Sequence, residues 1–440
     1  MGNRGVLRLA IFVVFWVMAH PLSLVSAALT LESSFNVTQT YTDNLFYDDK
    51  DREDDFGTLL GPNFELKYAN PDIEIGGTYF GRFVAYVNNP DQNRYIQNAN
   101  IILDLPFLTK QYKNLTVTID ESMNFTPQLD AFSLSGAQDA FTAPPVQSGA
   151  GGGSQVSSST QGVGGTQGVF TSRASSFLNR SGITLGYTWS PRLTPTLAYT
   201  NQYRHFFSTS RFQDSLAHTG SFSVPYEMTN ATIGPLYSYR QTDFLGKSTE
   251  GTSADKIISH NIQLQISYNF TPSLTGSIRG GTAFTKQKDA EEFEGGTTDN
   301  LSNKWQTNPI GGATLTKTYR NGSISLNANS TIASGGGLAS QAARTRYITG
   351  RIQHALSLKM NAFASFGYAQ NKSIGDGDAL DTNTYRIQSG VGYAFLPWLS
   401  GNLIYSHIKQ RSKGSAADDV QVNEVFLGLT AIADPWVLIR

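Results

Sequence analysis

Apolar and polar residues alternate with a period of two along most of the chain. In the segment 258–270, ISHNIQLQISYNF, every second position from Ile262 to Phe270 is apolar or aromatic, and the residues between are polar. Because successive side chains of a strand point to opposite faces, this pattern predicts a strand with one apolar and one polar face. A soluble β-sandwich can show the same alternation. The aromatic pair at the apolar end, Tyr268 and Phe270, favours the interfacial girdle of an outer-membrane barrel.

The pattern recurs to the end of the chain and predicts an all-β fold, a transmembrane antiparallel β-barrel of about 18 strands, within a range of about 16 to 20. An even number suits a barrel with both termini in the periplasm. Closure is required because a free sheet edge would leave backbone groups unpaired in lipid, so we expect 424–432 to pair with 29–41. The predicted strands are 29–41, 57–68, 73–86, 95–105, 115–125, 180–189, 196–207, 216–226, 231–242, 258–270, 274–285, 304–317, 323–333, 344–358, 362–371, 384–395, 399–408 and 420–432.

The connections between these strands alternate between short and long. Short turns are marked by pairs such as Asn70-Pro71 and Asn321-Gly322, whereas the intervening loops are polar and often acidic, as in 42–55. The longest connection, about 126–173, is rich in glycine and serine and too poor in apolar side chains to order itself. We interpret it as a disordered external loop; an interdomain linker is the alternative, but the strand pattern resumes unchanged after it. The chain from 28 to 440 is therefore predicted to be one barrel.

The first residues, 1–27, have the features of a secretory signal peptide. Arg4 and Arg8 precede an apolar core at 9–18, and Val25-Ser26-Ala27 is a small-residue cleavage site. A membrane anchor helix is the alternative, but the apolar run is short for spanning. The segment predicts export across the inner membrane of a Gram-negative cell and cleavage after Ala27.

Composition narrows the functional classes. Charged residues make up only 15% of the chain, glycine is abundant at 42 residues, and the formal net charge of -1 gives no attraction to nucleic acid. Cysteine is absent, which excludes disulfides, thiolate metal sites and cysteine nucleophiles. The glycine runs 151–153 and 335–337 lack a following Lys-Ser/Thr pair, so neither predicts a phosphate-binding loop. No cofactor, metal or catalytic residue is predicted.

The two ends of the predicted barrel carry related motifs. The opening LTLESSFNVTQTYTDNLFYDD (29–49) and the closing NEVFLGLTAIADPW (423–436) resemble the β-barrel porin families found beside exopolysaccharide-export and related surface-assembly systems. The resemblance implies an outer-membrane pore, a role in exopolysaccharide export, and as partners outer-membrane lipid, the barrel assembly machinery, and polysaccharide or periplasmic export proteins. One departure stands out: most such barrels finish on an aromatic residue, whereas this chain continues to Arg440.

Charged residues at the polar parity of the strands are the candidate site. Carboxylates predominate in the early strands and guanidiniums in the later ones, so a closed barrel would carry opposite charge on opposite walls of its lumen and set pore selectivity. The alternative is that these charges hold one another in salt bridges across a filled lumen. The early set is Glu65, Lys67, Glu74, Arg82, Asp104 and Asp120, and the later set is Arg180, Arg204, Arg240, Arg279, Arg351 and Arg386.

Two further classes compete with a pore. An outer-membrane enzyme would need a catalytic cluster, but the sequence contains no HExxH spacing or Ser/His/Asp grouping. The histidines of the mature chain stand one to a strand: His205, His218, His260, His354 and His407. A surface adhesin or scaffold with a plugged lumen is the main alternative, in which Phe46-Tyr47 and the acidic run after them bind a partner or divalent ions.

Overall fold

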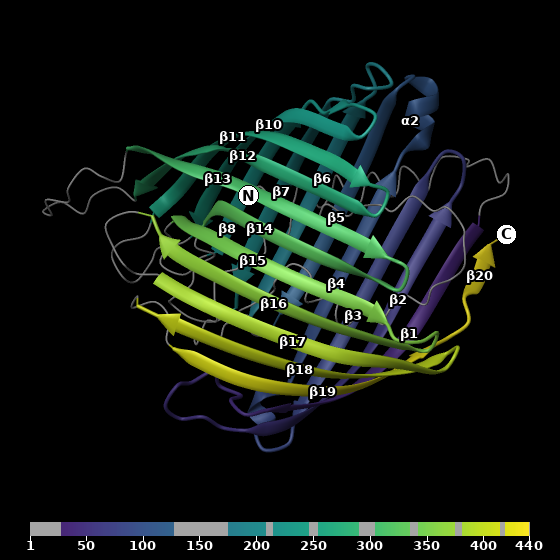
Figure 1. The fold of residues 1–440 in the computed structure, drawn as a ribbon, viewed down its shortest axis with the longest axis vertical. Coiled ribbons are helices and arrows are strands. Elements are labelled where there is room, and N and C mark those ends of the chain that lie inside the picture. The colour runs from purple at the N-terminus through teal and green to yellow at the C-terminus, as the bar shows by residue number, and fades with distance from the viewer. Residues whose placement is uncertain are drawn as a thin grey trace, which may run out of the picture.

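The computed structural model describes residues 28–126, 175–207, 214–245, 254–289, 304–334, 342–374, 381–413 and 419–439. These residues form one antiparallel sheet whose strands curve around a common axis, with the first strands beside the last (Figure 1). The predicted signal peptide lies outside the described residues, and so does all of the predicted disordered loop after Thr126. Two short helices, η1 (Pro90–Gln92) and α2 (Pro106–Gln111), interrupt the connections.

Eighteen of the strands form the barrel wall, as predicted, each hydrogen-bonded to its neighbour in the chain. They are β1 (Ala28–Thr42), β2 (Asp55–Ala69), β3 (Glu74–Tyr86), β4 (Arg94–Asp104), β5 (Leu115–Thr126), β6 (Ser176–Tyr187), β7 (Thr196–Phe206), β8 (Asp214–Ser223), β10 (Ala231–Leu245), β11 (Ala254–Thr271), β12 (Leu274–Asp289), β13 (Trp305–Tyr319), β14 (Gly322–Ser334), β15 (Ala342–Ala355), β16 (Met360–Ser373), β17 (Asp381–Leu396), β18 (Leu399–Ser412) and β19 (Val420–Ile432). The short strand β9 (Tyr226–Glu227) pairs with the start of β10.

The barrel closes between the first and last long strands, as the sequence predicted. β1 pairs with β19 from Ser34↔Ile432 to Thr42↔Glu424. The remaining edge of β1 is covered by β20 (Trp436–Ile439), which pairs Leu31 with Trp436. The edge of β1 is thus paired with β19 toward the loop end and with β20 at the turn end. A wall that faces hydrocarbon requires such pairing, because lipid offers no hydrogen-bonding partner.

The two ends of the barrel differ in their connections. At the turn end, where β1 begins and β20 lies, neighbouring strands are joined by tight turns such as 272–273, 320–321 and 397–398. At the loop end the connections are longer, beginning with residues 43–54, which we call the first loop. One turn-end connection differs from the prediction: the turn expected near 109–114 contains α2, whose first residue, Pro106, suits the start of a helix.

The outer face of the wall is apolar. On β11, the side chains of Ile262, Leu264 and Ile266 are 55, 47 and 42% exposed, and the polar residues between them face the interior. Large apolar side chains left half exposed along a closed sheet have no protein partner, and a lipid bilayer supplies one. The alternation, the closure and the sorted connections together define a transmembrane barrel of the outer membrane. Among the described residues, no helix is long and apolar enough to cross a membrane.

Candidate functional site in the barrel lumen

All of the predicted lumen charges lie on the inner face of the wall. On each strand they occupy the parity opposite to the exposed apolar side chains. Arg386, for example, is 9% exposed, whereas its neighbours Tyr385 and Ile387 on the outer face are 43 and 49% exposed. The inward set comprises Glu65 and Lys67 on β2, Glu74 and Arg82 on β3, Asp104 on β4, Asp120 on β5, Arg180 on β6, Arg204 on β7, Arg240 on β10, Arg279 on β12, Arg351 on β15 and Arg386 on β17.

The early wall carries a solvated group of acids near the turn end. Lys67 bridges two carboxylates, with its Nζ 2.9 Å from Glu65 and 3.2 Å from Glu32. Glu74 stands directly opposite Asp104 in the β3–β4 ladder. Because these side chains are largely exposed, their ion pairs contribute little stability, and their main effect is on the potential inside the lumen. Sequence reasoning missed Glu32, although it shares the parity of the polar residues of its strand.

Two other early charges are positioned by their immediate neighbours. The guanidinium of Arg82 lies 4.5 Å from the centre of the Phe80 ring, a cation–π contact on the inner face. Asp120 lies over Gly182 of the neighbouring strand, where an added Cβ would come within 2.3 Å of its Oδ1. The inward Arg94, which the sequence prediction also missed, has its guanidinium 5.6 Å from the Tyr86 ring.

The later wall concentrates positive charge. Arg180, Arg204 and Arg240 face inward from β6, β7 and β10, and Arg204 is diagonally opposite Arg180 in the β6–β7 ladder. The Nε atom of Arg240 is buried and has no hydrogen-bond acceptor among the described residues. Like charges repel, so grouping three guanidiniums is unfavourable unless hydrogen-bond acceptors, an anion or water offset their charge. This part of the lumen is therefore suited to negatively charged or strongly hydrogen-bonding solutes.

Arg279 and Arg351 are held by polar and aromatic neighbours. Arg279 donates through Nη2 to the Asn329 side chain at 3.1 Å, and Asn329 in turn donates to the Tyr347 hydroxyl at 3.3 Å. The side chain crosses β13 at Gly312, where a Cβ would lie 3.1 Å from its Nε. The guanidinium of Arg351 lies 5.4 Å from the Phe363 ring. Both arginines are thus fixed on the wall while keeping their charge in the lumen.

The five histidines of the described chain lie on the outer face. Three of them contact a partner on the neighbouring strand: His218 meets the Tyr199 hydroxyl at 2.7 Å, His260 meets Tyr237 at 2.8 Å, and His407 meets Asn423 at 2.7 Å. A fourth, His354 on β15, meets Tyr319 at the end of β13 at 3.2 Å, across the start of β14. The fifth, His205, pairs with Asp214 across the β7–β8 connection. The described histidines therefore belong to the outer face of the wall, where Tyr and His suit a membrane interface.

The first loop folds over the inner wall at the loop end. Tyr47 packs against Ile408, Val420 and Val422, which face inward from β18 and β19. Leu45 is only 3% exposed, and its backbone N–H donates to the carbonyl of Glu53 at 2.7 Å. The sequence prediction offered Phe46-Tyr47 as a surface for an external partner; instead, the Tyr47 ring is used to hold the loop against the barrel interior.

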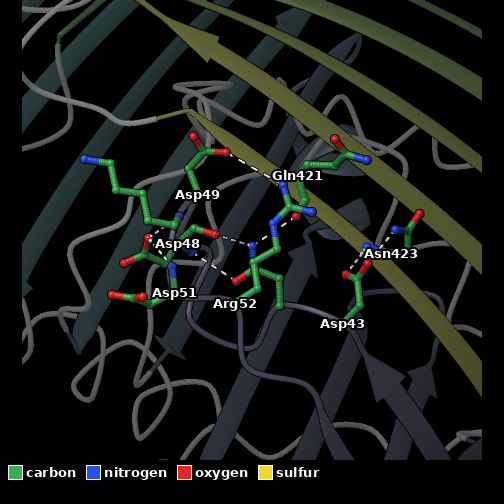
Figure 2. Close-up of polar contacts among 9 residues, drawn as sticks. Asp43, Asp48, Asp49, Asp51, Arg52, Gln421 and Asn423 are labelled. Carbon is green, nitrogen blue, oxygen red and sulfur yellow. Dashed lines mark hydrogen bonds and ion pairs between the residues drawn. The ribbon is translucent and has the colours of Figure 1, made fainter.

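Polar contacts tie the first loop to β19 (Figure 2). The buried Asn44 donates to the carbonyls of Asp48 and Gln421 at 2.6 and 3.0 Å, and accepts from the backbone N–H of Asp48 at 3.0 Å. Asp48 in turn accepts from the backbone N–H groups of Lys50 and Asp51 at 2.8 and 3.2 Å. These backbone donors hold the pKa of Asp48 below its ordinary value of 3.8, because they stabilise the carboxylate.

The lumen is tightly lined at the loop end and solvated at the turn end. Inward polar residues in the loop-end half of the strands, such as Thr38, Thr242, Asn371 and Gln410, are at most 6% exposed. Near the turn end, Glu32 and Glu65 keep side-chain exposures of 43 and 46%. Inward side chains are therefore closely packed at the loop end of the barrel and solvated at its turn end.

Comparison with known proteins gives likeness in shape only. No family model matches the chain, and no curated protein matches it. Solved structures that resemble it include Acinetobacter baumannii OccAB2 (TM-score 0.47, 10% identity, 93% of this chain and 98% of that chain), Pseudomonas aeruginosa OccK2 (0.45, 10%, 93% and 98%) and the Pseudomonas aeruginosa outer membrane protein opdK (0.43, 9%, 92% and 99%). The assignment to the outer membrane rests on the strand pairing and the apolar exterior of this chain itself.

Proposed function

We propose that the barrel is an outer-membrane pore that passes hydrophilic solutes and favours anions. The observation that carries the proposal is the row of inward arginines from β6 to β17, facing a lumen whose early wall bears most of the carboxylates. Barrels of 16 to 18 strands are generally wide enough to leave an aqueous channel. Passage down a gradient needs no covalent chemistry.

The loop-end half of the lumen, where inward side chains are buried, should dominate selectivity. At physiological ionic strength, charges more than about 8 Å apart in open water are largely screened. Two unit charges 4 Å apart interact by about 1 kcal/mol in water but by about 4 kcal/mol near a protein surface of lower effective dielectric. A solute passing the arginines where side chains crowd the interior therefore experiences their charge far more than it experiences the solvated acids near the turn end.

Conductance in planar bilayers tests the proposal. We expect the full mature chain to form channels whose reversal potential in a KCl gradient favours chloride, and the R204Q/R240Q double variant, which removes two arginines of the loop-end half, to lose much of that preference. The matched control is R192Q/R320Q, which removes the same charge from exposed turns. Selectivity and conductance unchanged by R204Q/R240Q would show that the lumen charges do not set selectivity, and an absence of channels from the folded barrel would overturn the pore itself.

A narrower form of the proposal is that the pore is the outer-membrane component of exopolysaccharide export. Its support is the resemblance of the two chain ends, 29–49 and 423–436, to the porin families found beside such systems. In the structure these two ends lie together at the barrel seam. Genes for glycosyltransferases and a polysaccharide co-polymerase beside the gene would favour export, whereas their absence would favour a general porin.

The second candidate is a surface scaffold or adhesin whose lumen is plugged. The observation in its favour is the burial of inward residues at the loop end, where Tyr47 packs on the inner wall. Liposome swelling separates the two candidates: a porin admits small sugars and the liposomes swell, whereas a plugged scaffold admits none. The same liposomes, with the barrel shown to be inserted and folded, serve for both outcomes.

A further inference from the structure

The register of β15–β18 arranges their outward side chains in rows. One row, Gly350, Phe366, Ile387 and His407, is mostly apolar; the next toward the loop end is Ile348, Tyr368, Tyr385 and Lys409; the third is Arg346, Gln370, Asn383 and Arg411. A fourth row contains Arg344, Lys372 and Asp381, and Lys413 lies beside it through its backbone bond to the Asp381 carbonyl. Each row lies about 7 Å further along the strands than the one before.

This order matches a crossing of the membrane boundary. Apolar side chains suit the hydrocarbon, tyrosines suit the interface, and cations suit the headgroup layer just beyond it. Arg346 and Lys372 line a hollow together with the buried inner-wall residue Asn308, so they do not belong to the lipid-facing surface. The outward cations Lys409, Arg411 and Lys413, which we call the cationic face, are all exposed. They therefore stand at the level where lipid headgroups meet the barrel at its loop end.

The cationic face keeps its charge available. Across β10–β12 the outward charges at the same end of the barrel are satisfied: Lys256 pairs with Asp243 at 3.1 Å, and Lys286 lies 6.0 Å from the Trp305 ring. Among the described residues, none of the cations in the cationic face forms an ion pair.

Two acids lie nearby, but they do not neutralise the face. Asp381 shares the row of Lys372, and Asp419 accepts the backbone N–H of Ser412 at 2.6 Å. Three cations against two carboxylates leave a positive excess. Exposed like charges that lie close together repel one another, so an anion that binds there relieves an existing cost.

The face contains a hollow suited to a phosphate-bearing headgroup. It has a volume of about 580 Å³ and lies over the outward side chains of β17 and β18, lined by Asn383, Tyr385, Lys409, Arg411 and Lys413. Lys409 and Arg411 lie on one face of β18, and Lys413 follows the end of that strand at the same parity. Tyr385 and Asn383 add a hydroxyl and an amide from β17.

We infer that the cationic face binds phosphorylated glycolipid of the outer leaflet, with the phosphate in the hollow over β17 and β18 and the acyl chains along the apolar rows below it. An arginine can bind phosphate in bidentate fashion, and the lysines add charge on either side of Arg411. A lipid fits better than a free anion because Tyr385, which lines the hollow, belongs to the tyrosine row, and the apolar row comes next along the strands. The site is on the outer wall, so it is separate from conduction through the lumen.

Native mass spectrometry of the full barrel in detergent tests the site, with a bis-phosphorylated glycolipid and its dephosphorylated form as probes. We expect the K409Q/R411Q/K413Q variant to bind the phosphorylated form roughly a hundredfold more weakly than the wild type, on the basis of about tenfold or less for each cation. The matched control K317Q/R320Q/K359Q removes the same residue types at the turn end and should bind like the wild type. The dephosphorylated form should bind wild type and K409Q/R411Q/K413Q equally weakly.

Several outcomes would overturn the inference. Equal binding of the phosphorylated glycolipid by wild type and K409Q/R411Q/K413Q would do so, and so would equal binding of the two glycolipids by the wild type. Inorganic phosphate binding as tightly as the glycolipid would assign the hollow to a free anion instead of a lipid. If the triple variant lacks the heat-modifiable gel mobility of a folded barrel, R411Q alone serves, with about a fivefold loss expected and no loss counting against the site.

Discussion

Asn423 donates both its backbone N–H and its side-chain amide to the carboxylate of Asp43, at 2.7 and 2.6 Å, across the junction of the first and last long strands. The side-chain oxygen of Asn423 is also in use, because it accepts the Tyr405 hydroxyl at 2.8 Å and meets His407 at 2.7 Å. Each residue belongs to one of the two terminal motifs that the sequence analysis set side by side. The two segments that resemble barrel porins are thus the ones that join the first and last long strands of this barrel.

Asp43→Ala should destabilise the barrel by loosening that junction. Hydrogen bonds to a charged group contribute about 1.5 to 3 kcal/mol each, so we expect the free energy of unfolding to fall by about 2 kcal/mol or more. Urea unfolding in detergent micelles, followed by tryptophan fluorescence, measures the change. Asp49→Ala is the control, because its contact with Arg52 is long, at 3.7 Å, and exposed, and such pairs contribute little. Equal effects of the two substitutions would contradict a fastening role for Asp43.

Tyr47→Ala should release the first loop from the inner wall. The partly buried ring packs on Ile408, Val420 and Val422, and because truncating a fully buried aromatic side chain costs about 3 to 5 kcal/mol, its loss should cost less than that. We expect a higher single-channel conductance and faster trypsin cleavage after Lys50 and Arg52, with the barrel itself intact. Tyr112→Ala, at an exposed turn-end tyrosine, should change neither quantity. A variant that conducts and resists trypsin like the wild type would show that the loop does not depend on this contact.

Low pH should loosen the same loop through Asp48. Its pKa in the folded loop is depressed by the backbone donors of Lys50 and Asp51, so its charge stabilises the folded loop above the unfolded pKa. That contribution is lost as the pH falls through the folded pKa, which lies below 3.8. Single-channel recordings between pH 7 and 3 should therefore show additional open-level fluctuation only at the acidic end. Asp48→Asn should show the same fluctuation at pH 7. A variant without additional fluctuation at pH 7 would show that the Asp48 carboxylate does not stabilise the folded loop.

Gly281→Ala should impair barrel assembly, whereas Gly280→Ala should not. A Cβ on Gly281 would come within 1.9 Å of the backbone carbonyl oxygen of Ile262, which belongs to the adjacent strand. A Cβ on Gly280 would meet no atom within 4 Å. Since the obstructing atom is backbone, the β11–β12 pair must separate to admit the methyl group. The fraction of each variant that shows folded gel mobility after refolding in detergent measures the difference. Equal refolded fractions would show that the β11–β12 strand pair accommodates the methyl group easily.

The faces of the strands were predictable from sequence because alternation directly encodes them. On β11 the predicted outward residues Ile262 and Leu264 are the exposed ones, and the inward parity of Arg279 on β12 follows from the same rule. Strand ends were less predictable. β11 begins at Ala254 instead of 258 because its ladder with β12 continues among polar residues, where alternation gives no signal.

The inward packing of the first loop could not be predicted from local pattern. Its contacts join Tyr47 to strands more than 350 positions later in the chain, and the surrounding loop is charged. A partial signal was present: Ile408, Val420 and Val422 are apolar at the parity that should face water. Such breaks in an otherwise regular alternation indicate that something covers the inner wall at that point.

The pairing of Trp436–Ile439 with the start of β1 makes the segment after Ile432 part of the barrel wall. β19 covers the edge of β1 only from Ser34 onward, so the seam near the turn end depends on this last segment. A fusion partner attached directly after it would crowd the seam, whereas a tag placed in an external loop would leave the seam undisturbed.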